Sequence, residues 1–131
     1  MKKRLIALGI LLIFAVVLAA CGGQSMSFSG SHSGMEKEMK ENSWKITAKS
    51  LNGTATRTVS MDATYLYVDN TNSEGKVFLI ITQGKVEKTV EIGEEFSDGI
   101  DMSDFEAGRV KLRLKFEKAK NVDVAIFWLN I

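Results

Sequence analysis

The stretch Arg109-Val-Lys-Leu-Arg-Leu-Lys-Phe-Glu117 decides the fold class of this chain. Apolar and charged side chains alternate strictly along it, with Val110, Leu112, Leu114 and Phe116 set against Lys111, Arg113, Lys115 and Glu117. A two-residue period places the two sets on opposite faces of a β-strand. The stretch therefore predicts a strand with one buried face and one face in water.

Segments on both sides of this stretch also have strand character, because they alternate or are rich in β-branched and aromatic residues. They are residues 44–50, 54–61, 63–69, 77–81, 86–92 and 122–130. Residues 77–81 form the continuous apolar run expected of a strand that is buried on both faces. With the first stretch, these segments predict about seven strands.

Turn residues separate the predicted strands. Asn52-Gly53 is typical of a tight hairpin, residues 118–121 predict another turn, and residues 93–107 predict a longer acidic connection. Short strands at this spacing favour an all-β domain, a single antiparallel β-sandwich over residues 44–131. Both an Ig-like and a jelly-roll-like topology fit the pattern.

Two resemblances concern the last third of the chain. The stretch Ile100-Asp-Met-Ser-Asp-Phe-Glu-Ala-Gly108 resembles a connection in jelly-roll carbohydrate-binding modules. Together with Glu117-Lys-Ala-Lys120 and the closing strand, it is similar to small uncharacterised lipoproteins of Gram-positive bacteria. Neither resemblance implies ligand residues in this sequence.

The first 20 residues predict a cleavable signal peptide. Lys2, Lys3 and Arg4 precede a run of 16 residues, Leu5 to Ala20, without a charge. Leu18-Ala19-Ala20-Cys21 resembles the lipobox of bacterial lipoproteins. That resemblance implies cleavage before Cys21, a diacylglyceryl group on its thiol, and a protein held by lipid on the extracytoplasmic face of the cell membrane.

Residues 21–43 are expected to tether the domain to this anchor. Residues 22–34 are rich in glycine and serine, which is typical of a flexible linker, and residues 35–43 are too few for a stable isolated helix. Without the three N-terminal cations, 14 basic residues face 16 acidic ones. A nucleic-acid partner would need a clearly basic domain, so we expect none.

The sequence lacks the constellations of enzymes and cofactor sites. His32 is the only histidine and lies in the predicted linker, while Cys21 is acylated on the lipoprotein interpretation. No phosphate-binding glycine loop or zinc-spaced ligand set occurs. We therefore expect neither catalysis nor a cofactor. Asp98, Asp101 and Asp104 are a weak calcium candidate, but their spacing does not match an EF-hand and favours turn formation.

Two groups of side chains are candidates for a ligand face. Lys111, Arg113 and Lys115 share one face of their strand. They could form a cationic patch that meets an anionic wall polymer or lipid headgroups, or they could be an ordinary solvated face whose lysines protect a sheet edge. Tyr65 and Tyr67 share a face of theirs and could stack on a sugar or pack in the core. The predicted function is a non-catalytic binding module for an envelope glycan, wall polymer or protein. The alternative is an assembly factor that docks on another envelope protein without a small ligand.

Overall fold

The structure is a computed structural model that describes residues 26–130 of the chain. The described part is all antiparallel β-structure, and it contains no helix long and apolar enough to cross a membrane. Its eight strands are β2 (Ser27–Ser33), β3 (Glu36–Lys40), β4 (Ser43–Met61), β5 (Tyr65–Thr71), β6 (Glu74–Gln83), β7 (Val86–Glu91), β8 (Glu95–Asp101) and β9 (Gly108–Trp128).

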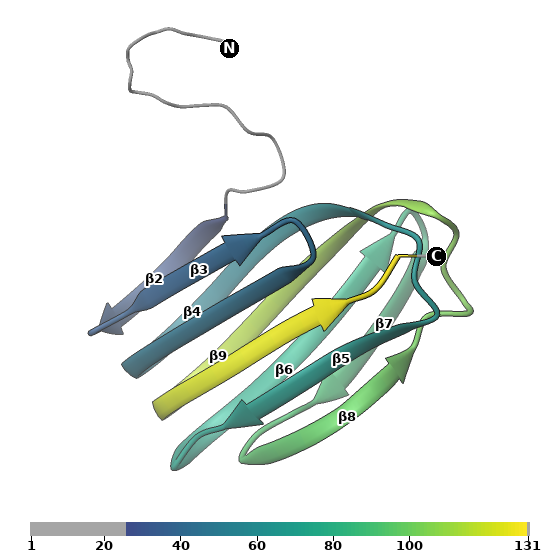
Figure 1. Cartoon of the computed structure of the whole chain (residues 1–131). Helices are drawn as coiled ribbons and strands as arrows, with labels where there is room; N and C mark the ends of the chain where they lie inside the picture. Colours follow the sequence, from purple (N-terminus) through teal and green to yellow (C-terminus); the bar gives the residue numbers. More distant parts are fainter. Residues whose placement is uncertain (1–25, 131) are drawn as a thin grey trace, which may run out of the picture.

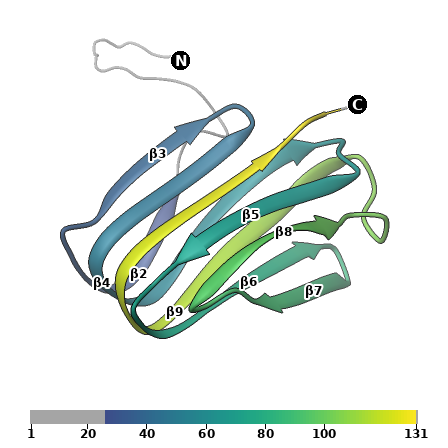
Figure 2. The same ribbon diagram turned by 60° about the horizontal axis from the view of Figure 1, so that its bottom comes forward.

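Two long strands, β4 and β9, hold the sandwich together. They pair antiparallel along almost their whole length, from Ser43 opposite Phe127 to Met61 opposite Gly108, and each bends from one sheet into the other. Figure 1 shows one layer in front, which we call sheet A; it consists of β3, residues 43–50, residues 122–128, β5 and β8. Sheet B consists of β2, residues 53–61, residues 108–117, β6 and β7 (Figure 2). The predicted antiparallel sandwich is confirmed.

The two expected turns, at Asn52-Gly53 and at residues 118–121, are corners within β4 and β9. The prediction of chain reversals there was wrong. Gly53 (φ +155°) lies opposite Gly30 (φ +138°) in the register, and a Cβ atom on Gly53 would stand 2.2 Å from the carbonyl oxygen of Ser29. Glycine is therefore needed for close backbone approach at a bulged corner, a role that a sequence motif cannot distinguish from a hairpin turn.

Part of the expected tether belongs to the domain, which corrects the boundary at residue 44. Residues 27–33 and 36–40 form β2 and β3, which pair with successive parts of β4. Phe28 and Met39 pack against the core from these edge strands, while the serines of β2 lie largely exposed. Glycine and serine composition suggested a linker, but the serines alternate with other residues at the two-residue period of a strand.

The expected acidic connection over residues 93–107 contains a strand, β8. It pairs with β5 over its full length, and Ile100 is buried while Phe96 packs against the core. These two apolar residues are four apart, with Gly99 and charged residues around them, so no continuous alternation marked the strand. The prediction that residues 93–107 form a connection without a strand was therefore wrong.

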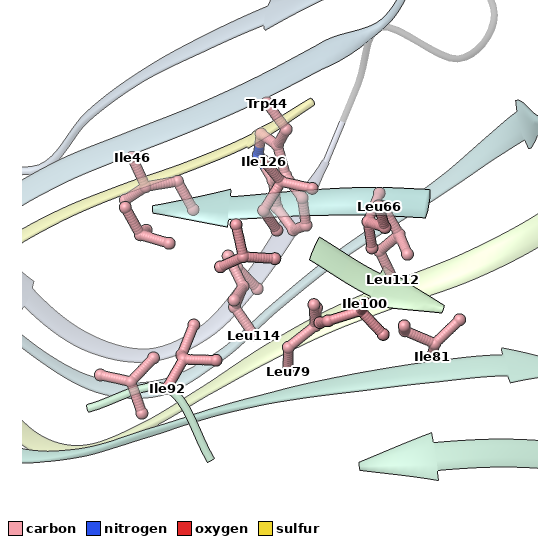
Figure 3. Packing of buried hydrophobic residues seen from close by; sticks show 14 of the residues in the cluster. Trp44, Ile46, Leu66, Leu79, Ile81, Ile92, Ile100, Leu112, Leu114 and Ile126 are labelled. Carbon is pink, nitrogen blue, oxygen red and sulfur yellow. The ribbon is translucent and has the colours of Figure 1, made fainter. Parts of the chain in front are cut away.

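The core lies between the inner faces of the two sheets. Figure 3 shows Trp44, Ile46 and Ile126 of sheet A lying over Leu79 and Leu114 of sheet B. Within residues 77–81, every second side chain is buried, whereas Phe78 and Ile80 are only half-buried on the outer face. That run is therefore buried on one face, not on both.

One cation, Arg57, points from sheet B into this core and is 2% exposed. Its guanidinium donates hydrogen bonds of 2.7 Å to the carbonyl oxygens of Ser43 and Lys40. Burial lowers the pKa of Arg57 below its ordinary value. Arg57 thereby ties sheet B to the β3–β4 turn at the edge of sheet A.

Candidate functional site

Three aromatic side chains gather on the outer face of sheet A. Tyr65 and Tyr67 come from β5 and Phe127 comes from β9, where Phe127 is the register partner of Tyr67. Both strands alternate buried and exposed residues, so the three side chains point away from the core. They are 44%, 37% and 45% exposed, respectively. We call these three residues the aromatic platform.

The ring of Tyr67 lies between the other two rings, with Phe127 beside it on the neighbouring strand and Tyr65 two residues away on its own strand. The Tyr67 and Phe127 rings are nearly parallel, with 19° between their planes and 5.3 Å between their centroids. The Tyr65 ring is tilted by 40° to that of Tyr67 at a centroid distance of 6.2 Å. Contacts between neighbouring rings restrict the rotamers of the three side chains.

Gly99 on β8 provides room for the platform. A Cβ atom there would stand 3.3 Å from Cε1 of Tyr67 and 3.5 Å from Cδ1 of Tyr65. The backbone of Gly99 does not have a positive φ, so its conformation does not require glycine. The absent side chain instead lets both tyrosine rings lean over the edge strand.

Polar side chains surround the aromatic platform on the same face. Asp69 follows Tyr67 by two residues on β5, and Asp101 lies opposite Tyr65 on β8. The Asp101 carboxylate accepts a 2.8 Å hydrogen bond from the backbone N–H of Ser103, and this bond lowers the pKa of Asp101. Farther across the sheet, a hollow of about 300 Å³ is lined by Glu36, Lys37, Glu38, Lys45 and Thr47.

The structure separates the two predicted groups of ligand residues. Lys111, Arg113 and Lys115 lie in the first half of β9, on the outer face of sheet B, whereas Tyr65 and Tyr67 lie on the outer face of sheet A. The two groups therefore face opposite sides of the sandwich and do not form one surface. Arg113 lies 3.6 Å from Glu87 and Lys115 lies 3.4 Å from Glu117, so two of the three cations are ion-paired.

Two of the three calcium candidates, Asp98 within β8 and Asp101 at its end, accept hydrogen bonds from neighbouring backbone groups. Asp98 accepts a hydrogen bond from the N–H of Gly99, and Asp101 accepts one from the N–H of Ser103, both at 2.8 Å. Over residues 26–130, no three histidine, cysteine or acidic side chains come close enough together to hold a metal ion. Asp101 therefore stabilises the turn that follows β8, as the spacing of the aspartates in the sequence favoured.

Sequence reasoning found two members of the platform and missed the third. Cys21, the predicted lipid acceptor, lies outside the described residues. Phe127 was not singled out because its strand is apolar on both faces. The available signal was that Ala125 and Phe127 of β9, and Leu129 just after it, alternate with the buried residues, which leaves large apolar side chains outside the core.

Comparisons with known proteins support the fold. The sequence matches no protein-family model, and no curated protein matches it. A carbohydrate-binding module of family 61, solved in complex with β-1,4-galactotriose, aligns with a TM-score of 0.52 at 17% identity, over 81% of this chain and 86% of that chain. This chain has the same jelly-roll sandwich fold. Of the two topologies that the sequence left open, the jelly roll is therefore confirmed.

Two variants of a family 29 carbohydrate-binding module are more distant. One aligns with a TM-score of 0.39 and the other, in complex with cellulohexaose, with 0.38. Both are 15% identical over 77% of this chain and 77% of theirs. All three structures are carbohydrate-binding modules.

Proposed function

We propose that the protein is a non-catalytic glycan-binding module and that the aromatic platform is its binding surface. The observation that carries this proposal is the exposure of Tyr65, Tyr67 and Phe127 together on one sheet face. The apolar surfaces of three aromatic rings are costly to leave in water, and a ligand that covers them recovers that free energy.

The chemistry of the surface suits a sugar. Each sugar ring has apolar C–H faces that can lie on an aromatic ring and hydroxyl groups at its rim that need polar partners. Asp69 and Asp101 stand beside the aromatic side chains and can accept hydrogen bonds from those hydroxyl groups. The shared fold with a module solved in complex with β-1,4-galactotriose supports the same class of ligand.

Affinity measurements on single substitutions test the proposal. The probes are β-1,4-galactotriose, cellohexaose, and the hexamers of N-acetylglucosamine and glucosamine, each titrated calorimetrically against the purified full chain. Tyr67→Ala and Phe127→Ala should each weaken the best interaction by at least tenfold, as expected of central aromatic contacts. Val86→Ala is the matched control, because Val86 is an apolar residue of β7 that is 40% exposed away from this face.

Two results would contradict the proposal. One is a Val86→Ala loss equal to those of the platform variants, which would show that the platform is not the binding surface. The other is the absence of binding to every probe while the platform variants abolish association with an envelope protein in pull-downs. That second result would favour the alternative, an assembly factor without a small ligand.

We further propose that lipid on Cys21 holds this domain at the outer surface of the cell membrane. Its support is the basic start, apolar run and lipobox of residues 1–21. Because the domain includes Met26, only residues 22–25 separate it from Cys21, and such a connection spans at most about 18 Å. Mass spectrometry of membrane-extracted protein should show an acylated Cys21 at the N-terminus; a retained Met1 or an unmodified thiol would refute the anchor.

A further inference from the structure

The outer face of sheet A, around the aromatic platform, has an excess of negative charge. Register partners and the alternation of each strand place the following carboxylates on this face: Glu36, Glu38, Asp69, Glu95, Asp101 and Asp123. The cations around the same face are Lys40, Lys45, Lys49 and Lys37, which lines the hollow beside Glu36 and Glu38. At neutral pH the face therefore carries a net charge of about −2.

The cations of this face lie on the Phe127 side of the aromatic platform. Lys45 lies opposite Ala125, diagonal to Phe127, and it also pairs in register with Glu38. Lys40 lies 3.7 Å from Glu38. The polar neighbours of the two tyrosines are instead carboxylates. Asp69 follows Tyr67 on the same strand, and Asp101 lies opposite Tyr65.

The two carboxylates differ in their surroundings. Lys88 donates a 2.9 Å hydrogen bond from its ammonium group to the backbone carbonyl oxygen of Asp101, so this lysine offsets part of the Asp101 charge. Asp69 has Ser97 and Ala125 as its cross-strand neighbours, and no basic side chain within residues 26–130 forms an ion pair with it. Asp69 is thus an exposed anion next to an aromatic ring.

The opposite face of the sandwich differs in charge. On the outer face of sheet B, five cations outnumber three carboxylates: Lys76, Arg109, Lys111, Arg113 and Lys115 against Glu87, Glu91 and Glu117. An anionic polymer would therefore be attracted to sheet B and repelled from the aromatic platform. The charges argue against uronic acids and phosphate-bearing glycans as ligands of the platform.

A positively charged group has two favourable interactions at the platform. An ammonium group over an aromatic face is attracted by the ring quadrupole, and an adjacent carboxylate adds a charge-assisted hydrogen bond. We propose that the aromatic platform selects glycans with free amino groups, such as glucosamine oligomers, over neutral, N-acetylated and acidic glycans. This inference rests on the proposed glycan-binding function and specifies its ligand class.

The experiment compares three hexamers on the full chain: glucosamine, N-acetylglucosamine and galacturonate. The first two differ only in the acetyl groups that remove the positive charge. Glucosamine hexamer should bind at least tenfold more tightly than its acetylated form, a difference of about 1.4 kcal/mol. Raising the salt concentration from 50 to 500 mM should reduce that preference, because exposed charges are screened.

Substitutions at the carboxylates identify the source of the preference. Asp69→Asn keeps the size of the side chain and one acceptor oxygen, replaces the other oxygen by an NH2 donor and removes the charge, so it should reduce the preference at least threefold. Glu87→Gln is the matched control, because Glu87 is an exposed carboxylate on β7 of sheet B. It should leave the preference unchanged.

The outcomes separate this inference from the proposed function. Equal binding of the glucosamine and N-acetylglucosamine hexamers, with loss of both in Tyr67→Ala, would overturn the charge selection and leave glycan binding intact. Tighter binding of galacturonate would overturn it as well. Failure of all three hexamers and of the neutral probes would remove the glycan-binding function itself.

Discussion

Replacement of the buried Arg57 by methionine should destabilise the domain by about 3 kcal/mol. Two charge-assisted hydrogen bonds, each 2.7 Å long, would be lost from the carbonyl groups of Lys40 and Ser43. Each such bond contributes about 1.5–3 kcal/mol, and removing a desolvated cation offsets part of the loss, which gives the lower end of the summed range. For a domain of about 100 residues, this corresponds to a decrease in Tm of roughly 12–24 °C.

Thermal and urea unfolding of purified variants test this magnitude. Arg109→Met is the control, because Arg109 is an exposed arginine at the start of β9 and its loss should change stability by less than about 0.5 kcal/mol. Arg57→Lys keeps the charge but cannot donate two hydrogen bonds in the same planar geometry, so it should fall between the wild type and Arg57→Met. Equal stability of Arg57→Met and Arg109→Met would refute a bridging role for Arg57.

Three further predictions concern single positions. Gly99→Val should displace the ring of Tyr67 and weaken glycan binding at least fivefold while Tm changes by less than about 4 °C; unchanged affinity would show that the rings do not depend on this space. Gly75→Ala should lower stability by at least about 2 kcal/mol in urea unfolding, because a Cβ atom would stand 2.3 Å from the carbonyl oxygen of Lys118 at φ +85°. NMR titration should find the folded-state pKa of Asp101 below its ordinary value of 3.8. The ionised Asp101 carboxylate then contributes fully to the free energy of unfolding above about pH 3.8. This contribution is lost as the pH falls through the folded-state pKa of Asp101.

Local periodicity was sufficient for the fold class. The alternation of Val110 to Phe116 depends only on which residues are buried, and the two-residue period holds in any sheet arrangement. It could not show that β9 continues through residues 118–121. Lys118 and Asn121 adopt positive φ values of 49° and 52° there, and only the packing of two sheets makes such a corner favourable.

The candidate site depended on information that local patterns do not contain. Tyr65 and Tyr67 were identifiable from their spacing on one strand. Their contact with Phe127 required the pairing of β5 with β9, whose residues are about 60 positions apart. Lys111 and Tyr67 face opposite sides of the sandwich because the first half of β9 lies in sheet B and the second half lies in sheet A. The bend between the two halves depends on tertiary packing, so local sequence patterns do not show it.

The most direct test of the central claim is amide chemical-shift mapping by NMR with the tightest-binding oligosaccharide of the panel. We expect the largest shifts in residues 65–69, 97–101 and 125–129, which together surround the aromatic platform on the outer face of sheet A. Shifts concentrated around Lys111, Arg113 and Lys115 on sheet B would contradict the assignment of the binding surface to the platform.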